Sequence, residues 1–564
     1  MSATERLAEA EALVRAGRTG QAVAVLRQLV AEAPGLAAAH ELLGSALQNA
    51  GDRAGAEAEF RAALTADSSR SAAAARLAVL LLARRLPAEA VEVLRPLTTD
   101  PKADVSLLTT YGAALKALER PEEAVEAYRR ASLTAPTDSA ARYNLASALG
   151  NARRFAESEA EVRAAMAMGL QAPEAWLVLG RALIGEMRFD DAEAALREAI
   201  ARRPGYADAH AELAQLIWMR TEDLDAAGRE LDRALADSPF DVGLGLARAK
   251  LLEYGRDPKT AYGSLADLLA MRTSDVTVQV AAALLALQFD PEVALSHAER
   301  AFELDPDNGP SAVALAQANL ALGRAGPAAR IAEDLGRAWP LDQLPVTLAA
   351  TAWRMMNDPR YADLYDYDRL VRTYVIDTPA GWPSLEAFLA DLAVSLRSLQ
   401  RLKAHPIGQS LRLGAQTGQF LALSEDPAIR AFFTALDAPI RAYIDVLAER
   451  DDVLGRRVSD GYRFAGAWSV LLRPGGHHVD HIHPMGWISS AFHVELPEAV
   501  ANGHQGWLKF GEPGLPTSPV LGPERFVRPR AGQLVLFPSY MWHGTVPFAG
   551  DEARLTAAFD IVPA

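Results

Sequence analysis

The chain has no cysteine among its 564 residues. Disulfides, thiolate zinc sites and thiol nucleophiles are therefore excluded, and any metal would have to be held by His, Asp or Glu. The chain also lacks a run of about 18 apolar residues, and its first residues include acidic side chains where a signal peptide would have an apolar stretch. These absences predict a cytoplasmic protein with no membrane segment.

Basic residues are fewer than acidic ones, 57 against 72, which gives a net charge of −15 and a pI of about 5.3. This balance argues against a nucleic-acid partner, because such binding depends mainly on phosphate contacts. The length is sufficient for at least two domains with separate cores. Tryptophan is scarce in the first part of the chain, since six of the nine follow Pro340. The composition thus changes near residue 340.

The first 340 residues are rich in Ala and Leu and repeat at a fixed spacing. One unit consists of Leu108, Tyr111, Gly112, Leu115, Ala124, Tyr128, Ala131 and Pro136. The same offsets recur 68 residues earlier, from His40 to Ala63, and 68 residues later, from Trp176 to Pro204. This spacing is twice the period of about 34 residues that is typical of tetratricopeptide repeats. We therefore predict an all-α tetratricopeptide-repeat solenoid over residues 1–340, with about ten repeats.

The residue types of the repeat have a packing explanation. Small Gly and Ala positions let the two helices of a repeat approach closely, large residues fill the seam, and proline ends the second helix. Such solenoids present a concave surface that binds peptides or protein segments. A peptide or protein substrate is therefore the expected partner, and a scaffold or dimerisation surface is the alternative.

Two regions follow the repeats. Residues 341–455 contain apolar residues at helical spacing, over 385–402 and 427–449, and predict a helical linking region packed on the next domain. Residues 456–564 contain short β runs separated by turn residues, with expected strands at 467–472, 479–483, 487–496, 506–510, 533–537 and 553–562. Many short strands predict a jelly-roll or barrel domain.

Seven of the 11 histidines lie in this last region, between His477 and His543. His481 and His483 are two residues apart in an expected strand, so both would point to the same face. His543 follows another β run. Non-haem Fe(II) is commonly held by two histidines and a carboxylate. We predict that these three histidines bind a metal.

A basic residue follows the histidines. Arg554 and Thr556 are again two residues apart in an expected strand. A guanidinium can pair with the carboxylate of an acidic cosubstrate through two hydrogen bonds, and the threonine hydroxyl could donate another. Arg554 and Thr556 are therefore the predicted cosubstrate-binding residues.

A rival metal pair remains open. His478 and Asp480 would restore the carboxylate, but in a regular strand they point away from the face that carries His481 and His483. We favour the second pair because it directly precedes Pro484 and the next expected strand. In a third arrangement only His481 and His543 bind the metal.

The C-terminal region resembles a known family through several motifs. These are Trp353-Arg354, Asp358–Tyr361, His405-Pro406, Gln409–Arg412, Trp468–Val470, His481–Pro484, Gly486–Ser490, Phe537–Ser539, His543 and Arg554. Over about residues 350–564 the chain is similar to the 2-oxoglutarate/Fe(II) oxygenases that follow tetratricopeptide arrays in bacterial proteins. The resemblance implies a double-stranded β-helix that uses Fe(II) and 2-oxoglutarate for hydroxylation. His483 departs from the family, where Asp or Glu is usual.

The expected function is thus a 2-oxoglutarate/Fe(II)-dependent dioxygenase that hydroxylates a peptide or protein recruited by the repeats. A peptide-binding adaptor without catalysis, a metal-dependent isomerase and a small-molecule oxygenase are the alternatives. We expect the remaining histidines and two tryptophans near the site to serve in packing, at the surface or in pocket walls. These are His477, His493, His504, Trp487 and Trp542.

Overall fold

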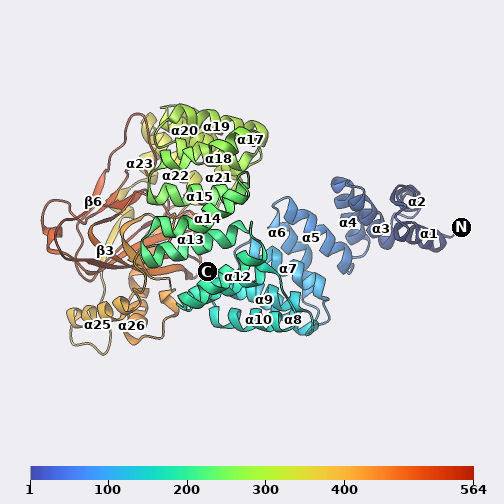
Figure 1. The fold of residues 1–564 in the computed structure, drawn as a ribbon, viewed down its shortest axis with the longest axis horizontal. Coiled ribbons are helices and arrows are strands. Elements are labelled where there is room, and N and C mark those ends of the chain that lie inside the picture. Colours follow the sequence, from blue (N-terminus) through green and yellow to red (C-terminus); the bar gives the residue numbers. More distant parts are fainter. Residues whose placement is uncertain (1, 419) are drawn as a thin grey trace. The chain divides into compact units, whose positions relative to one another are not determined.

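A computed structural model describes residues 2–418 and 420–564. The chain forms two compact units, Met1–Arg202 and Arg203–Ala564. The first unit is helical and the second combines further helices with two β-sheets (Figure 1). None of the helices in the described residues has both the length and the apolar character that crossing a membrane requires.

The first unit consists of successive antiparallel helix pairs. They are α1 (Ala3–Arg15) with α2 (Thr19–Glu32), α3 (Ala37–Asn49) with α4 (Arg53–Ala66), α5 (Ser71–Ala83) with α6 (Pro87–Thr98), α7 (Val105–Ala117) with α8 (Pro121–Thr134), α9 (Ser139–Asn151) with α10 (Phe155–Ala167), and α11 (Pro173–Gly185) with α12 (Phe189–Arg202). This is the repeat architecture that the spacing predicts.

The small positions of the repeats have the predicted role. A Cβ atom added to Gly44 of α3 would lie 2.8 Å from the ring of Phe60 in α4, closer than packed atoms tolerate. The same holds for Gly112 against Tyr128, at 2.8 Å, and for Gly180 against Leu196, at 2.9 Å. Glycine is therefore required where the large residue of the second helix lies on the first helix.

The second unit continues the helix pairs. They are α13 (Ala207–Thr221) with α14 (Leu224–Asp237), α15 (Val242–Gly255) with the short α16 (Pro258–Gly263) and α17 (Ala266–Met271), α18 (Val276–Ala286) with α19 (Pro291–Leu304), and α20 (Gly309–Ala321) with α21 (Ala325–Ala338). The interrupted pair α15 to α17 falls in the 207–272 stretch, where the repeat pattern is weak. Helix α22 (Gln343–Met356) closes the array.

The region predicted as a helical linking region contains strands as well. Its helices are α23 (Arg360–Leu364), α24 (Tyr367–Leu370), α25 (Leu385–Ser398), α26 (Pro427–Ala435) and α27 (Asp437–Ala448). Strands β1 (Arg372–Val375) and β2 (Leu411–Gln416) lie between them and form the two edges of the larger sheet. An all-helical region is therefore wrong: both strands are stabilised by pairing with β7 and β3, far along the chain.

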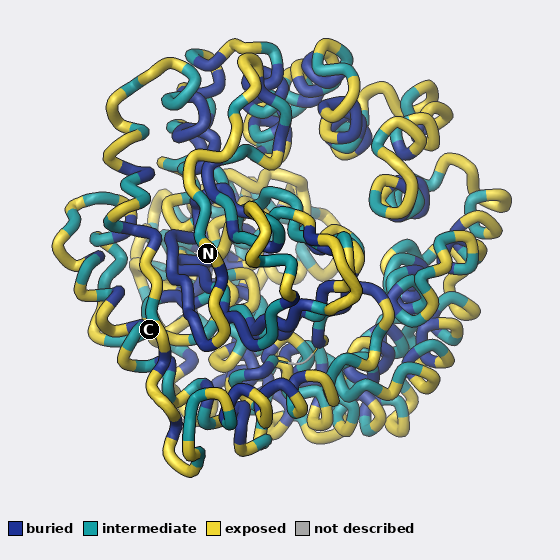
Figure 2. Tube along the Cα trace, turned by 90° about the vertical axis from the view of Figure 1, so that its left-hand side faces the viewer, coloured by how far each residue is buried: buried dark blue, intermediate teal, exposed yellow. Residues whose placement is uncertain are grey.

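The C-terminal strands form two antiparallel sheets. Their members are β3 (Tyr462–His478), β4 (Ile488–Glu495), β5 (Leu508–Phe510), β6 (Arg525–Val527), β7 (Gln533–Pro538), β8 (His543–Thr545) and β9 (Arg554–Pro563). The larger sheet has the order β1-β7-β4-β9-β3-β2, and the smaller β6-β5-β8. Phe510 of the small sheet packs on Phe537 of the large one, with ring centroids 5.0 Å apart. Figure 2 shows buried stretches in dark blue, and every residue of β7 is buried.

The fold class predicted from the sequence, a helical repeat array followed by an antiparallel jelly-roll-like β domain, is confirmed. One expected strand is wrong. Residues 479–483 are irregular, and β3 ends at His478. Only His481 keeps a β-type contact there, as an isolated bridge to His543. The chain leaves the sheet after His478 because the next residues pair with other segments. Val479 donates to the Ser410 carbonyl oxygen in a loop, and His481 bridges to His543 at the start of β8.

Helix α22 supports the loops on both sides of this bridge. The Thr347 hydroxyl donates to the Tyr540 carbonyl oxygen at 2.8 Å, and the Trp542 indole N–H donates to Thr351 at 2.9 Å. The backbone N–H of Gln343 donates to the Pro484 carbonyl at 2.8 Å. The last repeat helix therefore holds the segments next to His483 and His543.

Candidate metal centre and its pocket

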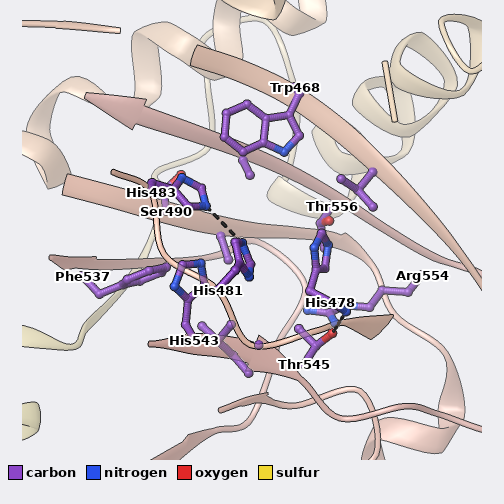
Figure 3. Close-up of a pocket in the computed structure, with 15 residues that line it drawn as sticks. Trp468, His478, His481, His483, Ser490, Phe537, His543, Thr545, Arg554 and Thr556 are labelled. Atoms are coloured by element: carbon purple, nitrogen blue, oxygen red, sulfur yellow. Dashed lines mark hydrogen bonds between the residues drawn. The ribbon is translucent and has the colours of Figure 1, made fainter. Parts of the chain in front are cut away.

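The structure brings His481, His483 and His543 together (Figure 3). One ring nitrogen from each lies within 4.8 Å of the other two. The Nε2 atoms of His481 and His483 are 3.2 Å apart. Two nitrogen ligands at right angles around one ion, each about 2.1 Å from it, lie about 3.0 Å apart. The spacing therefore fits two ligands of a shared metal ion.

Each of these imidazoles is oriented through its other nitrogen. Nδ1 of His481 donates to the Val479 carbonyl oxygen at 2.8 Å, and Nδ1 of His543 donates to the Met541 carbonyl oxygen at 2.9 Å. A carbonyl oxygen can only accept, so both Nδ1 atoms carry the proton and both Nε2 atoms present a lone pair. This is the tautomer that a metal requires, held by backbone groups.

The third histidine is oriented by a carboxylate. Nδ1 of His483 lies 2.6 Å from both oxygens of Asp560, and the Ser489 hydroxyl donates to the same carboxylate at 2.7 Å. Asp560 was not among the site residues predicted from the sequence. The sequence could have indicated it, because Asp560 is an even number of residues from Arg554 and Thr556 in the same strand and so faces the same side of the sheet.

Burial keeps the other two imidazoles neutral. It lowers the pKa of His481 to about 3, with the neighbouring His483 as the next cause. Burial, followed by the neighbouring histidines, also lowers the pKa of His543 well below its usual value. Neutral imidazoles are the form that binds metals.

Asp480 of the rival pair does not join the cluster. Its Oδ2 accepts from Lys509 Nζ at 2.8 Å, and burial raises its pKa. His478, in contrast, lines the pocket beside His481, although alternation in a strand predicted opposite faces. The parity argument fails for His478 because β3 ends at this residue. The geometry thus favours the three histidines over the His478/Asp480 pair.

The histidines border a cavity of about 50 Å³. This is several times the space that one water molecule needs. In Figure 3 the three histidines lie on one side, Thr556 and Arg554 lie on the other, and His478 is between them. Trp468, Phe537 and other mostly apolar residues complete the wall. A small polar molecule could reach from the histidines to the guanidinium.

Arg554 places a buried positive charge in the wall of the pocket. It is only 2% exposed, and its Nε and Nη1 atoms have no hydrogen-bond partner in residues 2–418 and 420–564. Its Nη2 donates to Nδ1 of His493 at 3.3 Å, and burial lowers the pKa of Arg554 to about 10. A buried guanidinium with free donors is costly unless an anion completes it. These donors fit a carboxylate, as the predicted role of Arg554 requires.

Two further residues were assigned no site role from the sequence. His493, expected at the surface or in packing, is fully buried and accepts the Arg554 hydrogen bond. Ser410 lies in a loop, with its hydroxyl 3.0 Å from His478 Nδ1 and 3.2 Å from His481 Nε2. Ser410 belongs to the family-like Gln409–Arg412 motif, but the motif alone gave it no role, and no local pattern marks His493. Each residue is brought to the site by contacts with distant segments.

The loop that carries Ser410 is fixed by a repeat helix. The Tyr254 hydroxyl of α15 contacts Nε2 of His405 at 2.5 Å and donates to the Leu411 carbonyl oxygen at 3.0 Å. The Arg412 guanidinium donates to the same hydroxyl at 2.7 Å and lies over the Tyr254 ring. The family-like motif from His405 to Arg412 thus attaches the β domain to a repeat.

Comparison with protein-family models gives two matches. Residues 466–560 match the model described as "Putative 2OG-Fe(II) oxygenase", and residues 7–70, 42–103 and 177–242 match a tetratricopeptide repeat. The search of curated proteins finds no match.

Solved structures similar to this chain include other repeat proteins. YrrB, described as a TPR protein with an unusual peptide-binding site, is 20% identical, with 33% of this chain and 95% of that chain covered and a TM-score of 0.30. A tetratricopeptide repeat protein from Parabacteroides merdae is 15% identical, with 43% and 95% covered and a TM-score of 0.36. PilF of Pseudomonas aeruginosa is 19% identical, with 37% and 94% covered and a TM-score of 0.32.

The class that the fold and the matches define is a helical repeat array followed by an antiparallel β domain. This chain is a tetratricopeptide-repeat protein whose C-terminal domain matches the 2OG-Fe(II) oxygenase family. That family implies iron and 2-oxoglutarate, and both the histidine cluster and the buried Arg554 guanidinium lie within the matched residues.

Proposed function

We propose that the protein is a 2-oxoglutarate- and Fe(II)-dependent dioxygenase that hydroxylates a peptide or protein substrate. One observation carries the proposal: a single cavity is lined by three imidazoles with converging lone pairs and, across from them, by a buried guanidinium. Two donor atoms of this guanidinium have no partner among the described residues. The first group suits a divalent metal. The second suits the carboxylate of a small dianion.

In this proposal His481, His483 and His543 hold the iron. Arg554 pairs with the cosubstrate carboxylate that is remote from the metal, and the Thr556 hydroxyl donates to it. Bound by these residues, iron and 2-oxoglutarate would supply the oxidative chemistry, in which O2 and 2-oxoglutarate give succinate, CO2 and one oxygen atom for the substrate C–H bond. Histidines fixed through Nδ1 need little reorganisation on metal binding.

The pocket walls have a second part in the reaction. Trp468, Leu508 and Phe537 line the cavity, so they limit the entry of water next to the metal side. Excluding water strengthens the pairing between Arg554 and a carboxylate. The protein therefore contributes orientation, charge and a partly apolar pocket.

The repeats are the proposed substrate-recruiting element. Tetratricopeptide repeats are generally protein- or peptide-binding modules, and tethering such a module to an active site raises the effective substrate concentration. The proposed domain limits are 1–340 for the array, 341–455 for the linking region and 456–564 for the oxygenase core. Strands β1 and β2 tie the linking region to that core.

The test is an anaerobic titration of the full chain with Fe(II) and 2-oxoglutarate. A metal-to-ligand charge-transfer absorbance that needs both components is expected, followed by succinate release when oxygen is admitted. Cell lysate incubated with the protein should then yield a peptide with one added oxygen by mass spectrometry. Iron binding with neither the absorbance nor succinate would contradict the proposal and favour a structural metal in an adaptor.

A further inference from the structure

Asp560 is a charged residue in an apolar strand. Its neighbours in β9, Phe559 and Ile561, are fully buried, and its own side chain is only 14% exposed. Taking a carboxylate out of water is costly unless strong partners compensate. A charged carboxylate at this position of the sheet is therefore unfavourable unless its partners stabilise it.

The hydrogen-bond partners of this carboxylate connect it to the histidine cluster. Asp560 accepts from Nδ1 of His483 and from the hydroxyl of Ser489. The Ser489 hydroxyl is in turn 2.8 Å from that of Ser539, and the Ser539 carbonyl accepts from the backbone N–H of His483 at 3.0 Å. Strand β9, strand β4, the loop that carries His481 and His483, and the Ser539 loop that precedes His543 thus meet around this carboxylate. Neither Ser489 nor a metal-bound His483 supplies a formal positive charge of its own.

The charge of the proposed metal site explains the arrangement. Two histidines and a carboxylate leave a divalent ion with a net single positive charge, whereas three neutral histidines leave it with two. We propose that Asp560 supplies, through His483, the negative charge that a carboxylate ligand supplies in the usual set. Asp560 is then a positioning residue that raises the donor strength of His483. This inference rests on the proposed iron site.

The inference predicts that the effect of Asp560 depends on which residue occupies position 483. With His483 present, Asp560→Asn should weaken Fe(II) binding about 10- to 100-fold, the range found when outer-shell partners of metal ligands are lost. With His483→Asp, the ligand itself carries the charge. Adding Asp560→Asn to that variant should then leave the affinity unchanged or higher, because two facing carboxylates no longer repel.

The measurements are anaerobic calorimetric titration with Fe(II) and the position of the charge-transfer band with 2-oxoglutarate. A weaker donor makes the iron harder to oxidise, so Asp560→Asn should move the band to shorter wavelength. A purely structural role would leave the band in place. Asp445→Asn, an exposed carboxylate in α27, is the matched control and should change neither quantity. Thermal unfolding of each variant checks that it folds.

The possible results distinguish a wrong role for Asp560 from a wrong proposed function. Wild-type affinity and band position in Asp560→Asn would overturn the inference, as would equal losses in the His483 and His483→Asp backgrounds. If Asp560→Asn does not fold, Asp560→Glu and Asp560→Gln are compared, and only the first should keep the band. A wild-type protein that binds no Fe(II) would instead refute the proposed function.

Discussion

Replacing Arg554 with methionine isolates the role of the buried guanidinium. Methionine is also long and unbranched, so the change removes the charge and the donors while filling much of the same space. Among the described residues, Nε and Nη1 of Arg554 have no hydrogen-bond partner. A hydrogen bond between charged groups contributes roughly 1.5–3 kcal/mol, so losing a bidentate pair should cost on the order of 3 kcal/mol. The Kd for 2-oxoglutarate should therefore rise about 100-fold.

The same change should act differently on stability. Arg554 is 2% exposed, so its charge is desolvated, and in the part of the chain that the structure describes its guanidinium hydrogen-bonds only to His493. Replacing such a buried charge with an apolar residue is often neutral or stabilising. We expect the free energy of unfolding of the metal-free Arg554→Met protein to be equal to or higher than that of the wild type. Arg554→Lys keeps the charge without the fork geometry and should lose about tenfold in affinity.

The assay is anaerobic calorimetry with 2-oxoglutarate in the presence of saturating Fe(II), together with urea unfolding of the metal-free protein. Arg463→Met is the control, because Arg463 is an exposed arginine in β3 of the same sheet. An unchanged Kd for 2-oxoglutarate would remove Arg554 from the site. A large loss of stability with unchanged affinity would show that Arg554 serves the fold.

Three further predictions concern the metal, pH and the attachment of the repeats. Asp480→Asn should keep the iron stoichiometry, measured by elemental analysis, because its carboxylate pairs with Lys509; alanine should abolish it at His481, His483 or His543. Iron loss in Asp480→Asn alone would reverse this assignment. Burial lowers the pKa of His405 from 6.5 to about 4, so the folded state takes up its proton less readily than the unfolded chain. The resulting penalty is absent above pH 6.5, reaches about 2 kcal/mol at pH 5 and levels off below pH 4. Urea unfolding at pH 7 and pH 5 should show this loss in the wild type and a smaller loss in His405→Gln, and equal losses would contradict it. Tyr254→Phe removes the hydroxyl shared by His405 and Arg412 and should lower the free energy of unfolding by about 2 kcal/mol in the same assay; an unchanged value would mean that the loop is held by other contacts.

The repeat array could be predicted because its interactions are local. Gly44 and Phe60 belong to adjacent helices of one repeat, and the same small and large pair recurs at Gly112 and Tyr128. The residues that pack on each other within a repeat are therefore close in the sequence and recur at the same spacing. Strands β1 and β2 could not be predicted, since β1 pairs with β7 more than 150 residues later and β2 pairs with β3.

The metal site was predicted in part for a reason that the structure does not support. His481 and His483 were expected on one face of a strand, yet the strand ends at His478. Their rings converge because His481 bridges to His543 and Asp560 holds His483. The choice of three histidines agrees with the observed cluster, and their role as ligands stays a proposal.

The sequence by itself determined the repeat architecture, the supply of imidazole ligands in a chain without cysteine, and Arg554 as the cationic residue near them. Residue type and short-range spacing carry this information. Only the tertiary structure decided that each histidine is anchored through Nδ1, that Asp560 stands behind His483, and that His493 holds Arg554. The contacts of Asp560 with His483 and of His493 with Arg554 join segments that are distant in the sequence, so sheet pairing and burial set these partners. The Nδ1 atoms of His481 and His543 contact carbonyl groups only two residues earlier, so their anchoring depends on the local backbone conformation of the folded chain.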